Sequence, residues 1–458
     1  MGGALSGCLF ARHALLPQGW RRDVLLEWDA AGDLTAVADN TAAPPGAEVA
    51  EYVLPGMVNL HSHAFQRALG GMTEVAGDGL DSFWTWRDLM YRFAHHITPP
   101  QMETIAAQLF AECLRHGYTA VCEFHYLQRD AAGALYARPA ETAERVLAAA
   151  RLSGIGVTML PVLYSHAGFG AQPLKPEQAR FRTGADDVLR IVEALAPQRG
   201  GQVEVGFAPH SLRAAGVAQI REVAQALPAD RPIHIHIAEQ QGEVRQSLDV
   251  TGLRPVQYLY DQIDVDARWC LVHATHVQPD EVALMAASGA VAGLCPTTEA
   301  NLGDGLFPLA EFIAAGGRFG VGSDSHVSQS PVEELRWLEY GQRLQRQQRN
   351  VAATPDERHV GDYLWQTALQ GGAQASGRKL GALAPGCRAD LLVLDDAHVN
   401  LYGVAIADVL GSVLFCGNDN LVRDVLCGGQ WQVRDGRHVA QDAIATAYKR
   451  TLAQLRAL

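Results

Sequence analysis

The 458-residue sequence predicts an α/β fold, in which a (β/α)8 barrel of the TIM type is joined to a small β-sandwich domain built from both chain ends. First, short apolar runs alternate with helical segments through a long middle region. Second, the two terminal segments resemble short strands separated by turns. Third, the chain is long enough for a barrel-sized domain and a smaller one.

Composition narrows the class of protein. The formal net charge is 37 − 50 = −13 and no basic run occurs, which argues against a nucleic-acid-binding surface. No stretch of about 18 or more apolar residues suggests a membrane span. The eight cysteines are scattered without CxxC spacing, as in a protein of the reducing cytoplasm. We expect a cytoplasmic protein that binds neither nucleic acid nor membrane, and we also expect a homo-oligomer, a dimer.

The terminal segments, residues 1–53 and 385–458, have the pattern of a β-domain. Their apolar runs are short, and glycine- and proline-containing turns interrupt them. The expected strands are Ser6–Ala14, Asp23–Trp28, Leu34–Val37, Ala389–Asp395, Gly411–Phe415 and Leu421–Gln432. Two such segments on either side of a long middle region predict one β-domain formed by both ends.

The middle region, residues 54–384, has the pattern of repeated βα units. Its expected strands are Met57–Leu60, Tyr118–Phe124, Gly156–Leu163, Val203–Ala208, Pro232–Ile237, Arg268–Val272, Ala290–Leu294 and Arg318–Gly322. Between them lie helical patterns such as Met102–Arg115, Thr142–Arg151, Ala185–Leu195 and Val217–Leu227. Eight such units favour a closed barrel. A doubly wound sheet is the alternative, but no glycine-rich phosphate loop follows the first strand.

The first barrel strand ends in two histidines separated by one residue, His61 and His63. Side chains alternate along a strand, so both imidazoles point to one face, roughly 6–7 Å apart along the backbone. Two imidazoles placed in this way can reach a single metal ion. An isolated pair is more often two polar loop residues, so its meaning depends on what recurs downstream.

Further polar side chains accompany the later strands. They are His210 after the fourth strand, His236 in the fifth, His273 after the sixth and Asp324 after the eighth. In a parallel barrel the carboxyl ends of the strands form one mouth, where active sites lie. Histidines that only satisfy hydrogen bonds at strand ends are a poor explanation for the whole set, so we expect a site at this mouth.

This order of residues resembles the amidohydrolase superfamily, in its mononuclear, deaminase-like branch. Residues 55–63, with the sequence PGMVNLHSH, and residues 322–326, with the sequence GSDSH, are similar to its opening and closing motifs. Residues 380–394, with the sequence LGALAPGCRADLLVL, resemble the return of the chain into its β-sandwich. The resemblance covers nearly the whole chain.

The resemblance implies one divalent metal ion, expected to be zinc, held by His61, His63, His236 and Asp324. Imidazoles with one carboxylate suit zinc, although iron and manganese remain alternatives. The fourth strand carries no lysine of the kind that members with two metals carboxylate. His234 and His236 share a strand face, and we choose His236 as the ligand because it lies nearer the barrel mouth.

Glu239, three residues after His236, indicates the reaction class. It resembles the glutamate of the His-x-x-Glu motif of aminohydrolases, which moves a proton to the nitrogen under attack. The resemblance implies that Asp324 accepts a proton from water and that His273 polarises the carbon centre. The alternative for Glu239 is a carboxylate that only stabilises a helix N-terminus.

Three loops resemble the N-formimino-L-glutamate deiminase family of histidine degradation: residues 63–71, 83–87 and 123–126. The resemblance implies Gln66 near the formimino group. It also implies that the glutamate part is held by Arg87, Tyr126, His210 and Arg213. A dianionic substrate needs fixed cations, and the arginine fork matches a carboxylate. The alternative is that these arginines form surface ion pairs.

We therefore expect a metal-dependent hydrolase that converts N-formimino-L-glutamate and water to N-formyl-L-glutamate and ammonia. One alternative is a nucleoside, purine or S-adenosylhomocysteine deaminase, or a triazine hydrolase, with the same metal set. A second alternative is a metal-free barrel that only binds a ligand.

Overall fold

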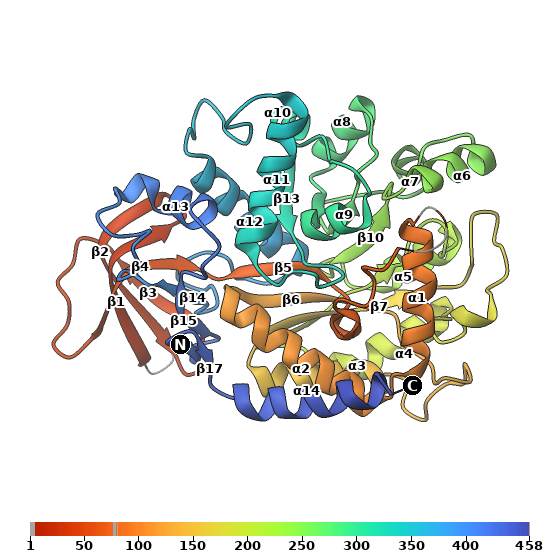
Figure 1. The fold of residues 1–458 in the computed structure, drawn as a ribbon, viewed down its shortest axis with the longest axis horizontal. Helices are drawn as coiled ribbons and strands as arrows, with labels where there is room; N and C mark the ends of the chain where they lie inside the picture. Colours follow the sequence, from red (N-terminus) through yellow and green to blue (C-terminus); the bar gives the residue numbers. More distant parts are fainter. Residues whose placement is uncertain (1–4, 77–78, 80, 458) are drawn as a thin grey trace.

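The computed structural model describes residues 5–76, 79 and 81–457, and it contains the expected barrel and β-domain (Figure 1). The barrel strands are β5 (Met57–Ser62), β6 (Tyr118–His125), β7 (Gly156–Leu163), β8 (Val203–Val205), β9 (Ala208–Pro209), β10 (Ile233–Ile237), β11 (Trp269–His273), β12 (Val291–Leu294) and β13 (Arg318–Val321). The expected fourth strand is divided into β8 and β9, both of which pair with β7.

The barrel closes through parallel pairing on both sides of its two sheets. Phe207 bridges to Ile233, and Ser62 bridges to Asp324, so that β13 returns to β5. Strands β6 and β7 are buried along their whole length. This is expected where helices cover the outside of a parallel barrel and side chains fill its interior.

The β-domain sheet combines strands from both chain ends. Its order is β17-β16-β15-β14-β4-β1-β2-β3. The strands are β1 (Leu5–Leu16), β2 (Gly19–Asp29), β3 (Leu34–Ala38), β4 (Glu48–Pro55), β14 (Leu391–Leu394), β15 (Val422–Cys427), β16 (Gln430–Arg434) and β17 (Arg437–His438). Pairing is antiparallel except between β1 and β4. Leu26, Val53 and Leu391 share one apolar core, which joins the two ends of the chain.

Helices surround the barrel (Figure 1). They are α1 (Phe83–His96), α2 (Pro99–His116), α3 (Glu141–Ser153), α4 (Ala185–Leu195), α5 (Val217–Ala226), α6 (Gln241–Thr251), α7 (Pro255–Gln262), α8 (Pro279–Ser288), α9 (Pro296–Leu302), α10 (Leu309–Ala314), α11 (Pro331–Arg346), α12 (Val360–Ser376), α13 (Val409–Phe415) and α14 (Gln441–Leu455). No helix within the described part of the chain is long and apolar enough to cross a membrane.

Helix α12 packs tightly behind β5 and β13. A Cβ added at Gly371 would lie 2.0 Å from the carbonyl oxygen of Phe319, and one at Gly372 would lie 2.9 Å from the Cβ of Val58. Only glycine permits this approach of helix to strand. The two strands that lead to His61 and Asp324 are therefore held against one rigid support.

One expected strand is wrong. Residues 411–415 belong to helix α13, which packs against α11 and α12. A short apolar run does not distinguish a buried strand from a buried helix. Here the helix brings its backbone against α12, since a Cβ on Gly361 would lie 2.7 Å from the amide nitrogen of Gly411.

The C-terminal helix α14 was also not expected, and it lies alongside α2 of the barrel (Figure 1). Tyr448 donates a hydrogen bond to the carbonyl oxygen of Arg67 at 3.3 Å, and the amide of Gln101 donates to Gln454 at 3.2 Å. The C-terminal segment therefore contributes strands to the β-domain and a helix to the barrel surface. The domain boundaries at residues 53/54 and 384/385 stay predictions.

Candidate active site

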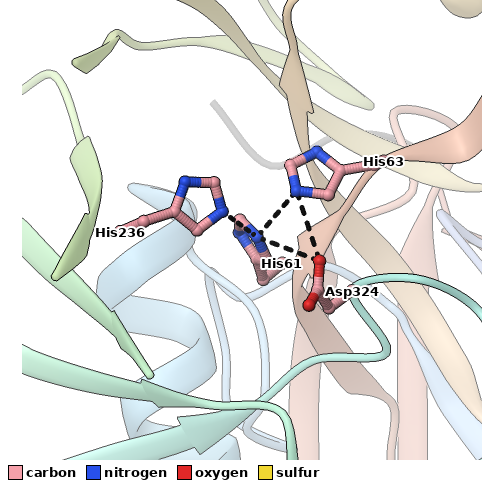
Figure 2. A group of neighbouring side chains, drawn as sticks. All are labelled: His61, His63, His236 and Asp324. Atoms are coloured by element: carbon pink, nitrogen blue, oxygen red, sulfur yellow. Dashed lines mark hydrogen bonds and ion pairs between the residues drawn. The ribbon is translucent and has the colours of Figure 1, made fainter. Parts of the chain in front are cut away.

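Four side chains from three strand ends converge at the barrel mouth: His61, His63, His236 and Asp324 (Figure 2). The Nε2 atom of His61 lies 3.1 Å from Nε2 of His63 and 2.9 Å from Nε2 of His236. The Oδ1 atom of Asp324 lies 3.2 Å from Nε2 of His63 and 3.5 Å from Nε2 of His61. All four residues are buried.

Backbone carbonyls orient two of these imidazoles. The Nδ1–H group of His63 donates to the carbonyl oxygen of Phe124 at 3.0 Å. The Nδ1–H group of His236 donates to the carbonyl oxygen of His210 at 2.8 Å. A neutral imidazole that donates from Nδ1 keeps a lone pair on Nε2, so both rings present acceptors to the centre of the cluster. Such outer hydrogen bonds are typical of metal-binding histidines.

The cluster fits one divalent metal ion. Nitrogen ligands at about 2.0–2.1 Å from a tetrahedral zinc ion lie roughly 3.3 Å from one another, close to the observed separations. Lone pairs that face each other across this distance repel unless a cation lies between them. Burial lowers the pKa of His61 to about 3, although Asp324 acts against it, so the imidazole is neutral and able to bind metal. Three neutral imidazoles and one carboxylate are a suitable set for zinc.

His234 lies on the same strand face as His236 but outside the cluster. Its Nε2 atom lies 2.8 Å from the carbonyl oxygen of Ala375, at the end of α12 away from the mouth. Burial lowers the pKa of His234 to about 4. His234 is therefore a packed, hydrogen-bonded residue outside the cluster.

Glu239 points its carboxylate toward the centre rather than toward a helix. Its Oε1 atom lies 3.7 Å from Nε2 of His273, and its Oε2 atom lies 3.9 Å from the guanidinium of Arg213. Glu243, in the first turn of α6, accepts the backbone N–H groups of Ala238 and Glu239 at 3.2 and 3.1 Å. These bonds fix the backbone of the segment that carries Glu239.

The pKa values of Glu239 and His273 are both raised, but for different reasons. Burial raises the pKa of Glu239, while His273 and Arg213 act against the increase. Burial alone would lower the pKa of His273, but the surrounding carboxylates, Glu239 first among them, raise it to about 10. A protonatable carboxyl beside a charged imidazole is suited to proton transfer.

The backbone is strained at these positions. His273 has φ of 67° and Asp324 has φ of 44°, both in the left-handed region that non-glycine residues seldom adopt. Ala238, just before Glu239, has φ of 51°. Conformations of this kind persist where the surrounding structure enforces them, and they are common at functional sites.

Two buried carboxylates support the site and were missed by the sequence analysis. Glu123 accepts hydrogen bonds from the Ser62 hydroxyl at 2.6 Å and from the Ala64 backbone N–H at 2.8 Å, which fixes the loop around His63. Glu299 accepts from Nδ1 of His273 at 3.3 Å. A glutamate within the apolar run of β6 was the available signal for Glu123; Glu299 lies far from any motif.

A cavity opens over the cluster. Every residue predicted to bind substrate lines it: Gln66, Arg87, Tyr126, His210 and Arg213. It is also lined by His63, His236, Glu239, His273 and Asp324. The amide of Gln66 donates to the Tyr126 hydroxyl at 2.8 Å, and its Oε1 atom has no partner among the described residues. The structure thus gathers the predicted residues in one space, while their individual roles stay predictions.

The two arginines share an aromatic support. The guanidinium carbon of Arg87 lies 4.7 Å from the ring centre of Trp84, and that of Arg213 lies 5.7 Å from it. The nearest carboxylate oxygens are 4.0 Å away for Arg87 and 3.9 Å away for Arg213. The Nε atoms of both are buried without a hydrogen-bond partner in the described chain. Both cations therefore contact the same indole and keep unused hydrogen-bond donors, which suits an anionic ligand.

The fold and this site define a metal-dependent hydrolase of the amidohydrolase class. The amidohydrolase family pattern matches residues 52–432, and the chain belongs to this family. Formimidoylglutamate deiminase from Pseudomonas aeruginosa is 53% identical to it over 98% of this chain and 99% of that protein.

Solved structures agree with this assignment. An amidohydrolase from Brucella melitensis is 43% identical, with a TM-score of 0.93 over 98% of this chain and 100% of that chain. An adenosine deaminase from Xanthomonas campestris, solved with bound zinc, is 20% identical, with a TM-score of 0.80 over the full length of both chains. The second similarity shows the fold alone.

Proposed function

We propose that this protein hydrolyses N-formimino-L-glutamate to N-formyl-L-glutamate and ammonia, in histidine degradation. One observation supports this most directly: a single cavity has a metal-binding cluster with Glu239 and also two guanidinium groups, those of Arg87 and Arg213, whose Nε atoms have no hydrogen-bond partner among the described residues. The 53% identity to a formimidoylglutamate deiminase supports the same substrate.

We propose zinc as the metal, held by His61, His63, His236 and Asp324. A divalent ion in this position supplies Lewis-acid chemistry, since it lowers the pKa of a bound water toward about 7. The protein excludes bulk water from the cluster, because each of the four side chains is buried.

Three side chains manage the protons. Asp324 accepts the proton that water loses on attack at the formimino carbon. His273, whose Nε2 atom lies 3.9 Å from Oδ2 of Asp324, donates a hydrogen bond toward the reacting centre. Glu239 delivers a proton to the departing nitrogen, so that the C–N bond breaks with release of ammonia. Water supplies the oxygen of the formyl product, and no redox partner is required.

The same cavity binds the glutamate part. Arg87 and Arg213 pair with its carboxylates, and an arginine fork can form two parallel hydrogen bonds to each carboxylate. Tyr126 and His210 complete the binding of this part, and their ring centres lie 4.9 Å from those of His63 and His236, respectively. The free Oε1 atom of Gln66 can accept a hydrogen bond from the formimino group.

An ammonia-release assay tests this function. The purified protein should release ammonia from N-formimino-L-glutamate and much less from adenosine, guanine or S-adenosylhomocysteine. The aromatic side chains in the cavity would suit a heterocycle, but a neutral base offers Arg87 and Arg213 no carboxylate, so charge-assisted hydrogen bonds worth roughly 1.5–3 kcal/mol each would not form. Comparable release from a nucleoside would contradict the proposal.

The proposal also includes the oligomeric state of the protein and its location in the cell. We propose a cytoplasmic homodimer with a small dianionic substrate and no nucleic-acid partner. The eight cysteines are all free, as in a reducing compartment, and the net charge is −13. Light scattering of the purified protein would test the dimer, and a monomer would contradict it.

A further inference from the structure

Two tyrosines line the cavity beside the arginines and have no role in the function described so far. Tyr91 comes from α1 and Tyr164 follows β7, and both are buried. Their hydroxyl oxygens lie 3.1 Å apart, a hydrogen-bond distance. The ring of Tyr91 lies 5.4 Å from the guanidinium carbon of Arg87. The hydroxyl pair is therefore next to one of the proposed carboxylate-binding cations.

The neighbouring Gln178 limits how these hydroxyl groups can bond. Its Oε1 atom accepts the backbone N–H of Lys175 at 2.9 Å, so its Nε2 end must face the tyrosines. That amide donates to Tyr164 at 2.7 Å and more weakly to Tyr91 at 3.5 Å. Both hydroxyl oxygens thus receive hydrogen bonds, and neither can donate to Gln178.

A count of hydrogens leaves one without an acceptor. The pair has two hydroxyl hydrogens, and the bond between Tyr91 and Tyr164 uses one of them. No acceptor for the other occurs within the described residues. A buried donor without a partner costs free energy, so the site is prepared for an acceptor that arrives with the ligand. Beside two guanidinium groups, a carboxylate oxygen is the matching acceptor.

We propose that Tyr91 and Tyr164 act as one substrate-binding unit, which donates a single hydroxyl hydrogen to a carboxylate of the substrate beside Arg87 and Arg213. The identity of the ligand as a dicarboxylate rests on the proposed function. This hydroxyl hydrogen serves as a specificity determinant, because it adds a directional hydrogen-bond donor to the two guanidinium groups.

The double variant Y91F/Y164F tests this proposal, since it removes both hydroxyl groups and keeps both rings. The KM for N-formimino-L-glutamate should rise about tenfold to a hundredfold, as for a lost hydrogen bond to a charged group. The inhibition constant of glutarate, which has two carboxylates but no formimino group, should rise by a similar factor. Metal content should be unchanged, and kcat should change by less than about threefold.

A matched control is Tyr260→Phe. The Tyr260 hydroxyl bonds to Ser288 at 2.7 Å, between α7 and α8 and outside the cavity, so this variant should behave like the native protein. If the double variant does not fold, Tyr91→Phe and Tyr164→Phe replace it, and at least one should show the increase in both constants. Native KM and native glutarate inhibition in these variants would overturn the proposal.

Calorimetry with glutarate separates this proposal from the proposed function. Native protein that binds glutarate but releases no ammonia from N-formimino-L-glutamate would contradict the function, while weaker glutarate binding by the double variant would still support the hydroxyl pair. Native protein that binds no glutarate would overturn the hydroxyl-pair proposal.

Discussion

The metal cluster and the arginine pair lie in one cavity but are held in different ways. Three of the four cluster residues lie on or directly after strands β5 and β10, and the fourth follows β13, where barrel pairing and α12 restrain the backbone. Arg87 lies on α1 and Arg213 in the segment after β9, and both rest on one indole. Under the proposed function, strand ends hold the groups for the reaction, whereas connecting segments hold the groups that bind the substrate.

The strongest test of this division removes a strand-end ligand. His61→Ala leaves three of four ligands, so metal content and turnover should fall together, by more than the 10–100-fold typical of outer-shell changes. Elemental analysis and the ammonia assay measure both. His234→Ala is the matched control, a buried histidine on β10 outside the cluster, and it should retain metal. Native protein with two metals per chain would contradict the single-metal site.

A substitution at Glu239 tests whether turnover can be lost while the four metal ligands still hold the metal. Glu239→Gln keeps the size of the side chain and removes its exchangeable acid, so turnover should fall about 10²–10⁴-fold with metal content unchanged. Metal loss in this variant would make Glu239 a ligand. Near-native turnover would reduce it to a structural residue.

The arginines should respond in the opposite way from the cluster. Arg87→Met or Arg213→Met should lower kcat/KM by about tenfold to a hundredfold, because a charge-assisted hydrogen bond is worth roughly 1.5–3 kcal/mol. Metal content should not change. Formimino compounds without carboxylates should be poor substrates and almost insensitive to either change. Arg221→Met, on the outside of the barrel where Arg221 bonds to Gln262, is the control.

Trp84 tests whether the arginine pair is supported by its shared ring. Trp84→Leu should lower kcat/KM by about twofold to thirtyfold, the range expected for cation–π contacts of 0.5–2 kcal/mol. Trp84→Phe should recover part of this loss because it restores an aromatic face. Equal activity in the leucine and phenylalanine variants would show that the ring contributes bulk alone.

The smallest expected effect concerns a contact between the β-domain and α12, outside both the metal cluster and the arginine pair. The indole N–H of Trp20, in the β-domain, donates to Asp362 of α12 at 3.0 Å. Burial raises the pKa of Asp362 to about 6, although Trp20 acts against it. The folded protein then binds more protons than the unfolded chain between pH of about 4 and 6, so this group contributes less stability as the pH rises through that range.

Asp362→Asn removes this dependence. Its free energy of unfolding relative to that of the native protein should be higher at pH 7 than at pH 4, by about 2 kcal/mol or less for a pKa raised from 3.8 to about 6. Thermal unfolding at the two pH values measures the difference. Metal content and KM should not change, and a change in either would extend the comparison to α12.

The sequence predicted the barrel well because local pattern and burial agree there. Runs such as 156–163 are buried along their whole length, as in parallel strands covered on both faces. The helical patterns between these runs are long enough to be recognised. It failed at 411–415, where five residues are too few for a period to distinguish helix from strand. It also missed α14, although Ile444, Tyr448 and Leu455 have the spacing of one helix face and are buried where the helix lies against α2.

For the site, the sequence by itself determined which side chains reach the barrel mouth, because alternation along a strand places His61 and His63 together and the parallel order brings His236 and Asp324 to the same end. Only the tertiary structure decided what lies between and behind them. Glu243 fixes the backbone of the segment that carries Glu239, and the indole of Trp84 contacts the guanidinium groups of both Arg87 and Arg213. These arrangements join residues distant in sequence through packing in three dimensions, and no local pattern encodes such contacts.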